Sequence, residues 1–379
     1  MGSKLSKNSV MPQKVISQVS TTTEINEQAK LNSLVPEPFT TQDAQLKHTL
    51  SDRIISVDEN AIRFVQAVKR GNLNELGAIY KSVDLKDKVN LLNYRGMWGC
   101  TPLLSACLFG QTDVAIWLLD HDVDKDLCNE RGVTPLLLAS LEGLTPVVRK
   151  IIDKGDKPRA LGMDNSIGIV YNASADRNMR LNPLLAASVN GHADIVELLL
   201  SNGAESNQNV DSVEVGGKAH QQRALLLSVK YRHTAVTRTL LRYAGDITLC
   251  DEDGNDALLL ACESMNENCA LVLIEEAKQQ NCVQLVLLKC NIQGYTALHY
   301  ASLHGLVNVC HGIIKNLDQV KLSLLLSIKT LTFEETALHL TSHMQNAGIV
   351  TALIEAGANG ELKDSRGRTA TQLMREWKN

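Results

Sequence analysis

Short apolar runs alternate with polar stretches along most of the chain, and the runs return at a regular interval. The run TPLLSA at 101–106 recurs as TPLLLA at 134–139, a step of 33 residues. Related runs begin at Asn182, Arg223, Asp256, Thr296, Thr336 and Thr369. Leucine and alanine recur within them at offsets of three and four, which places these side chains on one face of a helix. The pattern predicts a series of short amphipathic helices.

The stretch 96–129 shows how one period is expected to fold. Thr101 suits a helix N-cap, and Pro102 falls at the first helical position, where its missing N–H costs nothing. Gly110 is expected to end this helix. A second amphipathic run at 113–119 predicts another helix that lies back against the first. Such a unit exposes apolar surface on both sides, so it is stable only between neighbours.

This period, with its T-P-L-H-x-A-like core, resembles the ankyrin repeat family. The segments NGHADIVELLLSNGA at 190–204 and GIVTALIEAGAN at 348–359 are similar to the second half of that repeat. The resemblance implies a degenerate first repeat at 62–80, and seven fuller repeats from 101, 134, 182, 223, 256, 296 and 336, with a truncated one from 369. The implied fold is an all-α ankyrin-repeat solenoid of helix-turn-helix units with hairpin fingers, covering residues 60–379.

The chain departs from the family pattern at the motif histidine. Histidine occupies this position only at His299 and His339. Leucine replaces it at Leu104, Leu137, Leu185, Leu226 and Leu259. In the family the imidazole hydrogen-bonds to backbone between neighbouring repeats, so we expect most interfaces here to be more apolar.

The spacing departs from the pattern as well. The steps after 134 and 182 are 48 and 41 residues, and the two steps from 256 to 336 are 40 each. We expect the extra residues between a second helix and the next first helix, where the family has its fingers. The largest insertions, 156–180 and 208–222, are polar and contain glycine, which suits surface loops. They are either tolerated extensions or binding loops.

Residues 1–59 contain no repeat and are rich in Ser, Thr, Gln and Lys, which predicts a disordered tail. Its start, MGSKLSK, fits the N-myristoylation pattern, with Gly2 as the acceptor, although a chance match is the alternative. One such chain binds membranes only marginally, at about 10⁴ M⁻¹. Lys4, Lys7 and Lys14 would add attraction to anionic lipid. We therefore expect a cytoplasmic protein held reversibly, as a peripheral protein, at the cytoplasmic face of a membrane.

Composition narrows the possible functions further. The net charge of −4 gives no basic footprint, so no nucleic-acid partner is expected. Neither a secretory signal nor an apolar run of about 18 residues is found. The nine cysteines lie largely within helical patterns, which favours free thiols in a reducing compartment over a disulfide framework.

The resemblance implies that a protein partner binds the concave face, formed by the fingers and the outer part of the first helices. The positions carried over in the early repeats are Met97, Trp98, Cys100, Leu108, Phe109, Val133 and Leu141. Their large apolar side chains are of the kind that anchors interfaces. The alternative is that this patch packs under the tail or the first repeat. A second, weaker surface is predicted at Tyr231, Tyr295, His304 and Met344.

No catalytic, cofactor or metal site is predicted. Cys310 and His311, near His299 and His304, lack a C-x-x-C pair, and adjacency in sequence does not orient a nucleophile and base. The run 251–254 is similar to part of a calcium loop but lacks its final glutamate, so we interpret it as a finger. Phosphate-loop, H-E-x-x-H and G-x-S-x-G patterns are absent. The sequence favours a non-catalytic adaptor or scaffold; the alternative is a regulatory or targeting subunit that inhibits or positions an enzyme.

Overall fold

A computed structural model describes residues 59–155, 168–172, 177–207, 210–213 and 219–376. The predicted tail, with Gly2, Lys4, Lys7 and Lys14, lies outside the described residues. The chain divides into two compact units, the larger of which spans 58–169 and 179–379. The described part of the smaller unit comes from strands β1 (Gly168–Asn172) and β2 (Arg177–Leu181), which pair in a two-stranded sheet.

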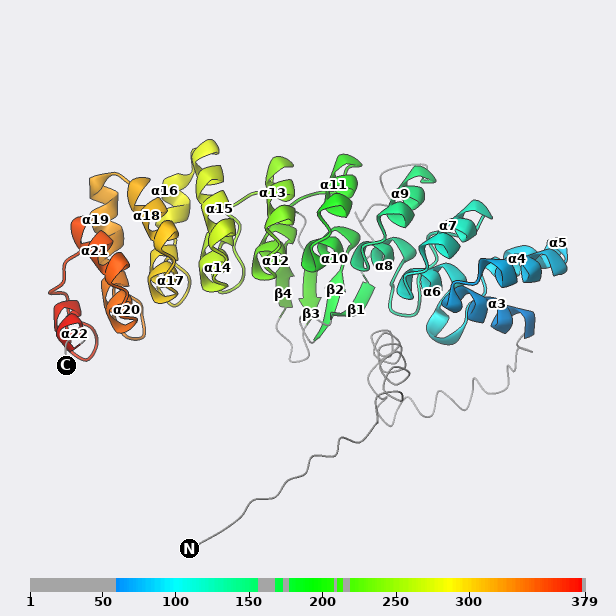
Figure 1. Cartoon of the computed structure of the whole chain (residues 1–379), viewed down its shortest axis with the longest axis horizontal. Coiled ribbons are helices and arrows are strands. Elements are labelled where there is room, and N and C mark those ends of the chain that lie inside the picture. The colour runs from blue at the N-terminus through cyan, green and yellow to red at the C-terminus, as the bar shows by residue number, and fades with distance from the viewer. Residues whose placement is uncertain (1–58, 156–167, 173–176, 208–209, 214–218, 377–379) are drawn as a thin grey trace, which may run out of the picture. The chain divides into compact units, whose positions relative to one another are not determined.

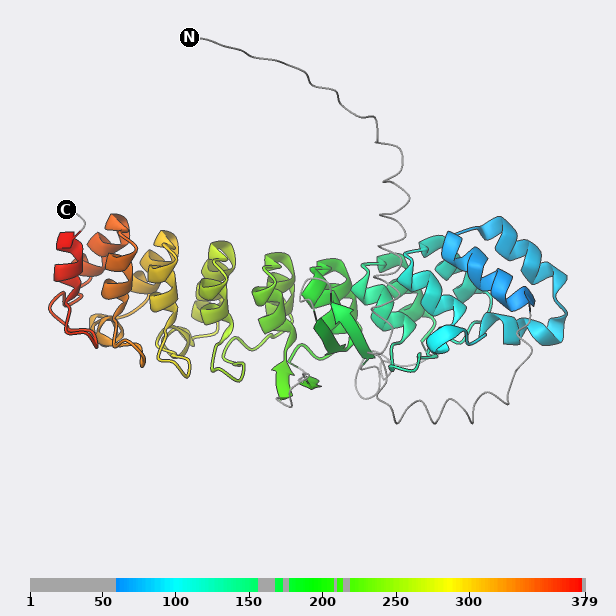
Figure 2. The same ribbon diagram turned by 90° about the horizontal axis from the view of Figure 1, so that it is seen from below.

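The larger unit is a stack of helix pairs, which Figures 1 and 2 show from two sides. First helices contact first helices of the neighbouring repeats, and second helices contact second helices. The pairs are α3 (Glu59–Arg70) with α4 (Leu73–Ser82), α6 (Pro102–Leu108) with α7 (Thr112–Asp120), α8 (Pro135–Leu141) with α9 (Thr145–Asp153), α10 (Pro183–Asn190) with α11 (Ala193–Ser201), α12 (Ala224–Lys230) with α13 (Thr234–Arg242), α14 (Ala257–Glu263) with α15 (Glu267–Gln279), α17 (Ala297–Leu303) with α18 (Val307–Lys315), and α20 (Ala337–His343) with α21 (Ala347–Glu355). The single helix α22 (Ala370–Glu376) ends the described stack. The helical solenoid and all the predicted repeat starts are confirmed.

The motif's first residue is the N-cap of the first helices from α6 to α20, and in most of them its side chain accepts a hydrogen bond from the backbone, although that of Arg223 in α12 does not. Thr101 Oγ1 accepts a hydrogen bond from the Leu104 N–H at 3.2 Å, and Asn182 Oδ1 accepts one from the Leu185 N–H at 2.8 Å. Pro102 follows at the first helical position, as predicted. These caps satisfy backbone donors that have no partner inside the helix, so the motif defines where each repeat begins.

The extra residues adopt two kinds of structure. In the insertion 208–222, strands β3 (Val210–Val213) and β4 (Ala219–Gln222) form an antiparallel hairpin. In the two 40-residue steps the extra residues form short helices, α16 (Val283–Leu287) and α19 (Gln319–Ser327), rather than longer fingers. A similar helix, α5 (Leu85–Leu92), follows the first repeat. Each buries at least two apolar side chains, and this burial explains why these segments are helical.

The fingers of neighbouring repeats are linked by backbone hydrogen bonds. The N–H of Glu130 donates to Trp98 O at 3.2 Å. Farther along, the N–H of Ile292 donates to Asp253 O and that of Leu331 donates to Gln293 O, each at 2.9 Å. These bonds join segments more than thirty residues apart and hold the fingers in register.

The core between repeats is mainly leucine, as expected from the missing motif histidines. The five replacing leucines are all buried: Leu104, Leu137, Leu185, Leu226 and Leu259. His299 accepts a hydrogen bond at Nδ1 from the Thr296 N–H, 3.1 Å away, and its Nε2 lies 3.2 Å from Ile328 O in the next finger. His339 makes the equivalent contact to Arg368 O at 3.3 Å. Burial lowers the pKa of His299 to about 4 and also lowers the pKa of His339. Both interfaces therefore contain a neutral imidazole at neutral pH.

All nine cysteines are free, and Cys107, Cys262, Cys269 and Cys310 are buried. Burial raises the pKa of the Cys310 thiol to about 12, so the thiol stays protonated inside the stack. None of the helices in the described residues has both the length and the apolar character needed to cross a bilayer.

Candidate functional site

The early group of predicted partner-binding residues does not form one exposed patch. Met97 lies in a short 3₁₀ turn (Met97–Gly99) and is 75% exposed, while Trp98 beside it and Phe109 are half-buried. Leu108 and Leu141 end the first helices of neighbouring repeats and are buried. Their prediction as exposed anchors is therefore wrong: first helices pack side by side, and this packing encloses their last apolar residue.

Phe109 is covered by the first repeat. The Lys69 ammonium of α3 lies 5.5 Å from the centroid of the Phe109 ring, within the range of a cation–π contact. This contact supports the alternative that part of the early patch packs against the first repeat. Met97 is the exposed side chain of this group, and Trp98, Cys100 and Phe109 are half-buried.

The later group comes together around a tyrosine that the sequence reasoning missed. Tyr295 precedes α17, and His304 caps its C-terminal end. Between them lies Tyr300, whose ring centroid is 5.0 Å from that of Tyr295 and 6.4 Å from that of His304, with both pairs stacked. We call Tyr295, Tyr300 and His304 the aromatic row. The sequence could have indicated this row through Tyr300, the tyrosine of TALHYA, because the other fuller repeats have serine, alanine or leucine at this position.

The two remaining residues of this group lie at other repeats. Tyr231 caps the C-terminal end of α12 and is half-buried. Met344 caps α20 and is 54% exposed. Both occupy the same end of their first helix as His304 does of α17, but Met344 belongs to the next repeat and Tyr231 to the repeat two before.

A pocket of about 350 Å³ lies in the repeats that precede the aromatic row. We call it the acidic pocket; it is lined by Lys230, Asp251, Asp253, Asn255, Leu260, Glu263 and Ser264. The end of α12 supplies the lysine, the finger before α14 supplies the two aspartates and the asparagine, and α14 with its cap supplies the rest. Fingers and first helices thus build the pocket together.

Hydrogen bonds between amides connect the acidic pocket to the aromatic row. Asn291 Nδ2 donates to Asn255 Oδ1 at 3.0 Å and lies 3.2 Å from Tyr300 Oη, to which it also donates. Asn255 in turn donates to Asp251 through its backbone N–H at 2.8 Å and through Nδ2 at 3.2 Å. Because Asn255 and Asn291 are both buried, this network holds Asp251 and Tyr300 in a defined arrangement.

The electrostatics of the acidic pocket show an excess of negative charge. Burial and the nearby Asp251 carboxylate raise the pKa of Glu263, and Lys230 only partly offsets them. Burial and then the charge of Glu263 raise the pKa of Tyr300 to about 12, so the phenol is neutral. Glu263 lines the same pocket as the finger carboxylates of Asp251 and Asp253.

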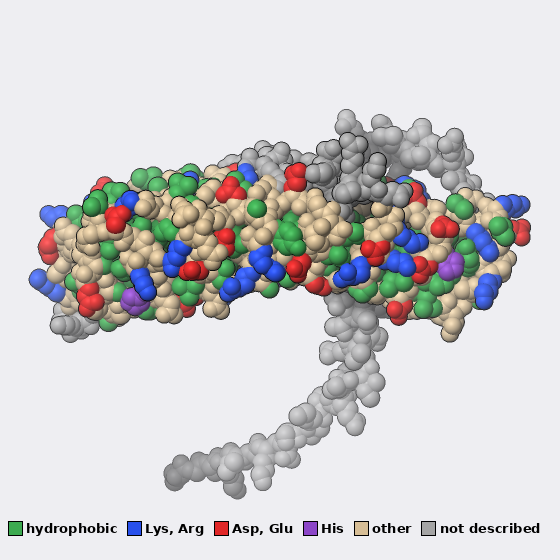
Figure 3. Space-filling model, turned by 90° about the horizontal axis from the view of Figure 1, so that it is seen from above, with side chains coloured by type: hydrophobic (Ala, Val, Ile, Leu, Met, Phe, Trp, Pro, Cys, Tyr) green, Lys and Arg blue, Asp and Glu red, His purple; other side chains and the backbone are tan. Residues whose placement is uncertain are grey.

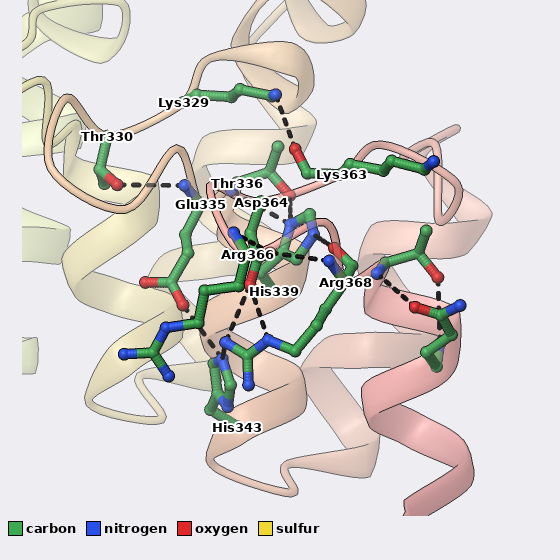
Figure 4. A network of polar contacts seen from close by, with 12 residues as sticks. Lys329, Thr330, Glu335, Thr336, His339, His343, Lys363, Asp364, Arg366 and Arg368 are labelled. Atoms are coloured by element: carbon green, nitrogen blue, oxygen red, sulfur yellow. Dashed lines mark hydrogen bonds and ion pairs between the residues drawn. The ribbon is translucent and has the colours of Figure 1, made fainter.

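A second polar cluster joins the last repeats and is satisfied internally (Figure 4). Glu335 Oε1 lies 3.0 Å from His343 Nε2, and Arg368 Nη2 lies 2.8 Å from Asp364 Oδ2. Lys329 Nζ donates to Lys363 O at 2.7 Å. Two ion pairs and one contact to a backbone carbonyl therefore connect the fingers around α20.

A groove of about 550 Å³ lies on the second helices α11, α13 and α15. Its charged lining residues are Asp194, Glu197, Arg238, Arg242 and Glu276. Arg242 Nη1 lies 3.7 Å from Glu197 Oε1, so opposite charges already face each other. Figure 3 shows acidic and basic side chains interspersed on the side of the stack turned toward its viewer. This groove therefore has no strong preference for a charged ligand.

No group of three or more His, Cys, Asp or Glu side chains within the described residues is arranged to hold a metal ion. His304 belongs to the aromatic row, and Cys310 is buried within α18. The two therefore do not form the accessible nucleophile and base that a thiol enzyme needs.

Comparison with known proteins agrees with the fold. The profile for ankyrin repeats in three copies matches residues 64–160 and 225–322, and the profile for a single ankyrin repeat matches 180–211. Because the first profile alone covers more than half of the chain, the protein belongs to the ankyrin repeat family. Ankyrin repeats are generally non-catalytic interaction modules, which indicates a protein–protein interaction role.

Several curated proteins are similar to parts of the chain. NF-kappa-B inhibitor alpha of Sus scrofa is 32% identical over 123 residues, which is 32% of this chain and 36% of that protein. Ankyrin repeat domain-containing protein SAT10 of Stachybotrys chartarum is 29% identical over 46% of this chain and 9% of its own length. E3 ubiquitin-protein ligase XBAT33 of Arabidopsis thaliana is 29% identical over 36% of this chain and 29% of its own length. The chain thus spans 9% to 36% of the length of these three relatives.

Proposed function

We propose that this protein is a non-catalytic adaptor that binds a protein partner on the surface formed by its first helices and fingers, centred on the aromatic row. The observation that carries the proposal is the stack of Tyr295, Tyr300 and His304 beside the acidic pocket. Aromatic side chains are enriched among the residues that dominate interface energy, and only 4% of this chain is aromatic. Tyr300 is buried, so the half-buried rings of Tyr295 and His304, which stack on it, are the anchors available to a partner.

The arrangement supports binding without a large rearrangement. Tyr300 is held by Asn291, and Tyr295 and His304 stack on its two sides. Side chains already held in place lose little conformational freedom when a partner binds, so more of the contact energy contributes to affinity.

The test is proximity labelling in cells with the wild-type chain and a Tyr295→Ala/His304→Ala variant. We expect the variant to lose at least one protein that the wild type labels, because both side chains are partly accessible anchors. Tyr243→Ala, at the C-cap of second helix α13, is the control for loss of a half-buried tyrosine elsewhere. An unchanged set of labelled proteins in a folded double variant would place the partner surface elsewhere.

We further propose that the chain is tethered reversibly to the cytoplasmic face of a membrane through myristate on Gly2, assisted by Lys4, Lys7 and Lys14. The pattern MGSKLSK supports this proposal. At roughly 1 kcal/mol per basic residue near anionic lipid, each lysine should contribute about fivefold to membrane affinity at low salt.

Metabolic labelling with a myristate analogue tests the lipid directly. The wild type should incorporate the label and Gly2→Ala should not, and equal incorporation would refute the proposal. Replacing the three lysines by glutamine should leave the labelling intact while reducing the membrane-bound fraction. If the membrane-bound fraction is unchanged by this substitution, the three lysines do not contribute to membrane binding.

A further inference from the structure

The acidic pocket contains carboxylates that are not paired with other groups of the described stack. Three carboxylates and one ammonium group line it, from Asp251, Asp253, Glu263 and Lys230. Both carboxylate oxygens of Asp251 already accept hydrogen bonds from Asn255. Within the described residues, neither a hydrogen bond nor an ion pair within 4.0 Å engages the side-chain carboxylates of Asp253 and Glu263. These two carboxylates can therefore accept hydrogen bonds from a ligand.

The position of the pocket favours a side chain of a bound protein over a small free cation. It lies on the surface formed by fingers and first helices, next to the aromatic row, and its Lys230, Asp253 and Glu263 side chains are exposed. Its volume of about 350 Å³ is larger than a bare metal ion requires and is suited to one long side chain. The half-buried rings of the aromatic row, Tyr295 and His304, provide a surface alongside, against which the aliphatic part of such a side chain can pack.

We propose that the acidic pocket binds an arginine side chain of the protein partner, with its guanidinium group shared between Asp253 and Glu263. The inference rests on the proposed function, because it assigns one contact of the partner on that same surface. A guanidinium group has five donors in a planar fork and pairs with carboxylates in a bidentate manner. It also stacks on aromatic rings more readily than an ammonium group does, so arginine should bind more tightly than lysine next to the half-buried rings of Tyr295 and His304.

The second-helix groove provides an internal comparison. It too has three carboxylates, but it faces them with two arginines, one of which is paired with Glu197. A basic side chain would meet repulsion from Arg238 and Arg242 there. Preference for arginine should therefore depend on the acidic pocket and not on the acidic character of the chain as a whole.

The test uses the full chain and fluorescein-labelled heptapeptide pools, measured by fluorescence polarisation. The central residue is arginine, lysine or citrulline, and the flanking positions are randomised among uncharged residues. Citrulline has nearly the shape of arginine but no charge. We expect the arginine pool to bind roughly tenfold or more tightly than the citrulline pool, with lysine between them, because hydrogen bonds to charged groups contribute that much.

Two variants locate the effect. Asp253→Asn/Glu263→Gln should reduce the affinity for the arginine pool roughly tenfold or more, whereas Glu197→Gln/Glu276→Gln, with the same change in net charge, should leave it unchanged. Thermal unfolding of each variant checks that it is folded. Equal binding of the arginine and citrulline pools, no binding of any pool, or an equal loss in both variants would overturn the inference.

Failure of the inference and failure of the proposed function give different results. If Tyr295→Ala/His304→Ala loses labelled proteins in cells while Asp253→Asn/Glu263→Gln retains them all, the partner surface stands and the arginine contact is wrong. If the aromatic variant also retains every labelled protein, the proposed surface itself is wrong, and the arginine contact is overturned with it.

Discussion

At the residue scale, histidines connect the repeats in two different ways. His299 and His339 occupy the motif position and contact the carbonyl of a residue in the next finger. His192 and His233 precede second helices instead, and their Nε2 atoms lie 3.1 Å from Leu141 O and 2.8 Å from Val189 O of the preceding repeat. The second kind occurs in the middle of the chain, in repeats where Leu185 and Leu226 occupy the motif position.

The contact of His233 requires a glycine opposite it. Gly191 ends α10 with φ of +82°, and a Cβ atom there would lie 2.5 Å from His233 Nδ1. Gly110, with φ of +67°, has nothing within 4 Å of the corresponding position. The backbone strain of an alanine is therefore similar at the two sites, but the clash exists only at Gly191.

We predict that Gly191→Ala destabilises the chain more than Gly110→Ala does. The strain alone should cost about 1 kcal/mol at each site, and displacement of His233 should add about 1–2 kcal/mol at Gly191. Urea unfolding followed by circular dichroism measures both. Equal midpoints for the two variants would show that the contact with His233 contributes nothing.

Asp256 is an N-cap with an unusual pH dependence. It replaces the threonine of the motif, is buried, and accepts a hydrogen bond from the Leu259 N–H at 2.9 Å. Burial raises its pKa from 3.8 to about 7, although the backbone hydrogen bonds oppose the shift. Between these two values the folded state binds more protons than the unfolded state, so this residue makes the chain less stable as the pH rises from about 4 to about 7.

We predict that Asp256→Asn raises the melting temperature at pH 8 and changes it little at pH 4, because asparagine keeps the cap acceptor without the buried charge. Asp318→Asn is the control. Hydrogen bonds from Lys321 lower the pKa of the exposed Asp318, so its contribution to stability is present above its unfolded pKa. That substitution should lower the melting temperature at pH 8. Two variants that respond in the same direction would contradict the assignment of Asp256.

At the element scale, the helices α5, α16 and α19 share one property. Each follows the second helix of its repeat, packs part of its apolar surface inward and exposes the rest. In α19, Leu325 is 1% exposed and Leu324 is 57% exposed. The pattern of leucines in LSLLLS does not by itself distinguish the buried face of α19 from the exposed one, because three adjacent positions are leucine.

We predict that Leu325→Ala costs about 2–4 kcal/mol of unfolding free energy and Leu324→Ala less than about 0.5 kcal/mol. The difference arises because only the buried side chain leaves a cavity. Chemical denaturation of the two variants measures it. Similar costs would mean that α19 does not pack on the stack as described.

At the scale of the whole molecule, stability is expected to be the sum of repeats and their interfaces. The last described helix, α22, packs against α20, and the turn that precedes α22 supplies the Arg368 carbonyl oxygen that His339 contacts. Deleting 364–379 removes both. We predict faster hydrogen exchange in 336–355 after this deletion and unchanged exchange in 101–153, because coupling passes mainly between neighbours. Faster exchange along the whole stack would instead indicate a single cooperative unit.

Much of the molecule could be predicted from local sequence. The starts of the first helices follow from Thr101 and its equivalents, since a cap and the apolar residues after it are only a few positions apart. The burial of Leu108 and Leu141, and the bonds of His192 and His233, were not predictable in this way. The two histidine contacts join residues 51 and 44 positions apart, and the two leucines are enclosed where first helices of neighbouring repeats pack together, an arrangement that the local pattern does not specify.

The sequence by itself determined the class of fold, the number of repeats and the leucine-rich character of their interfaces, because a period of 33 residues repeats the same local preferences. The tertiary structure decided which surface carries the candidate site. Tyr295, Tyr300 and His304 form a row only because α17 places them on one side, and the finger at 251–255 meets Glu263 only because two elements of the stack converge there. Side chains from separate turns and helices become one site through packing, and packing is a property of the folded stack.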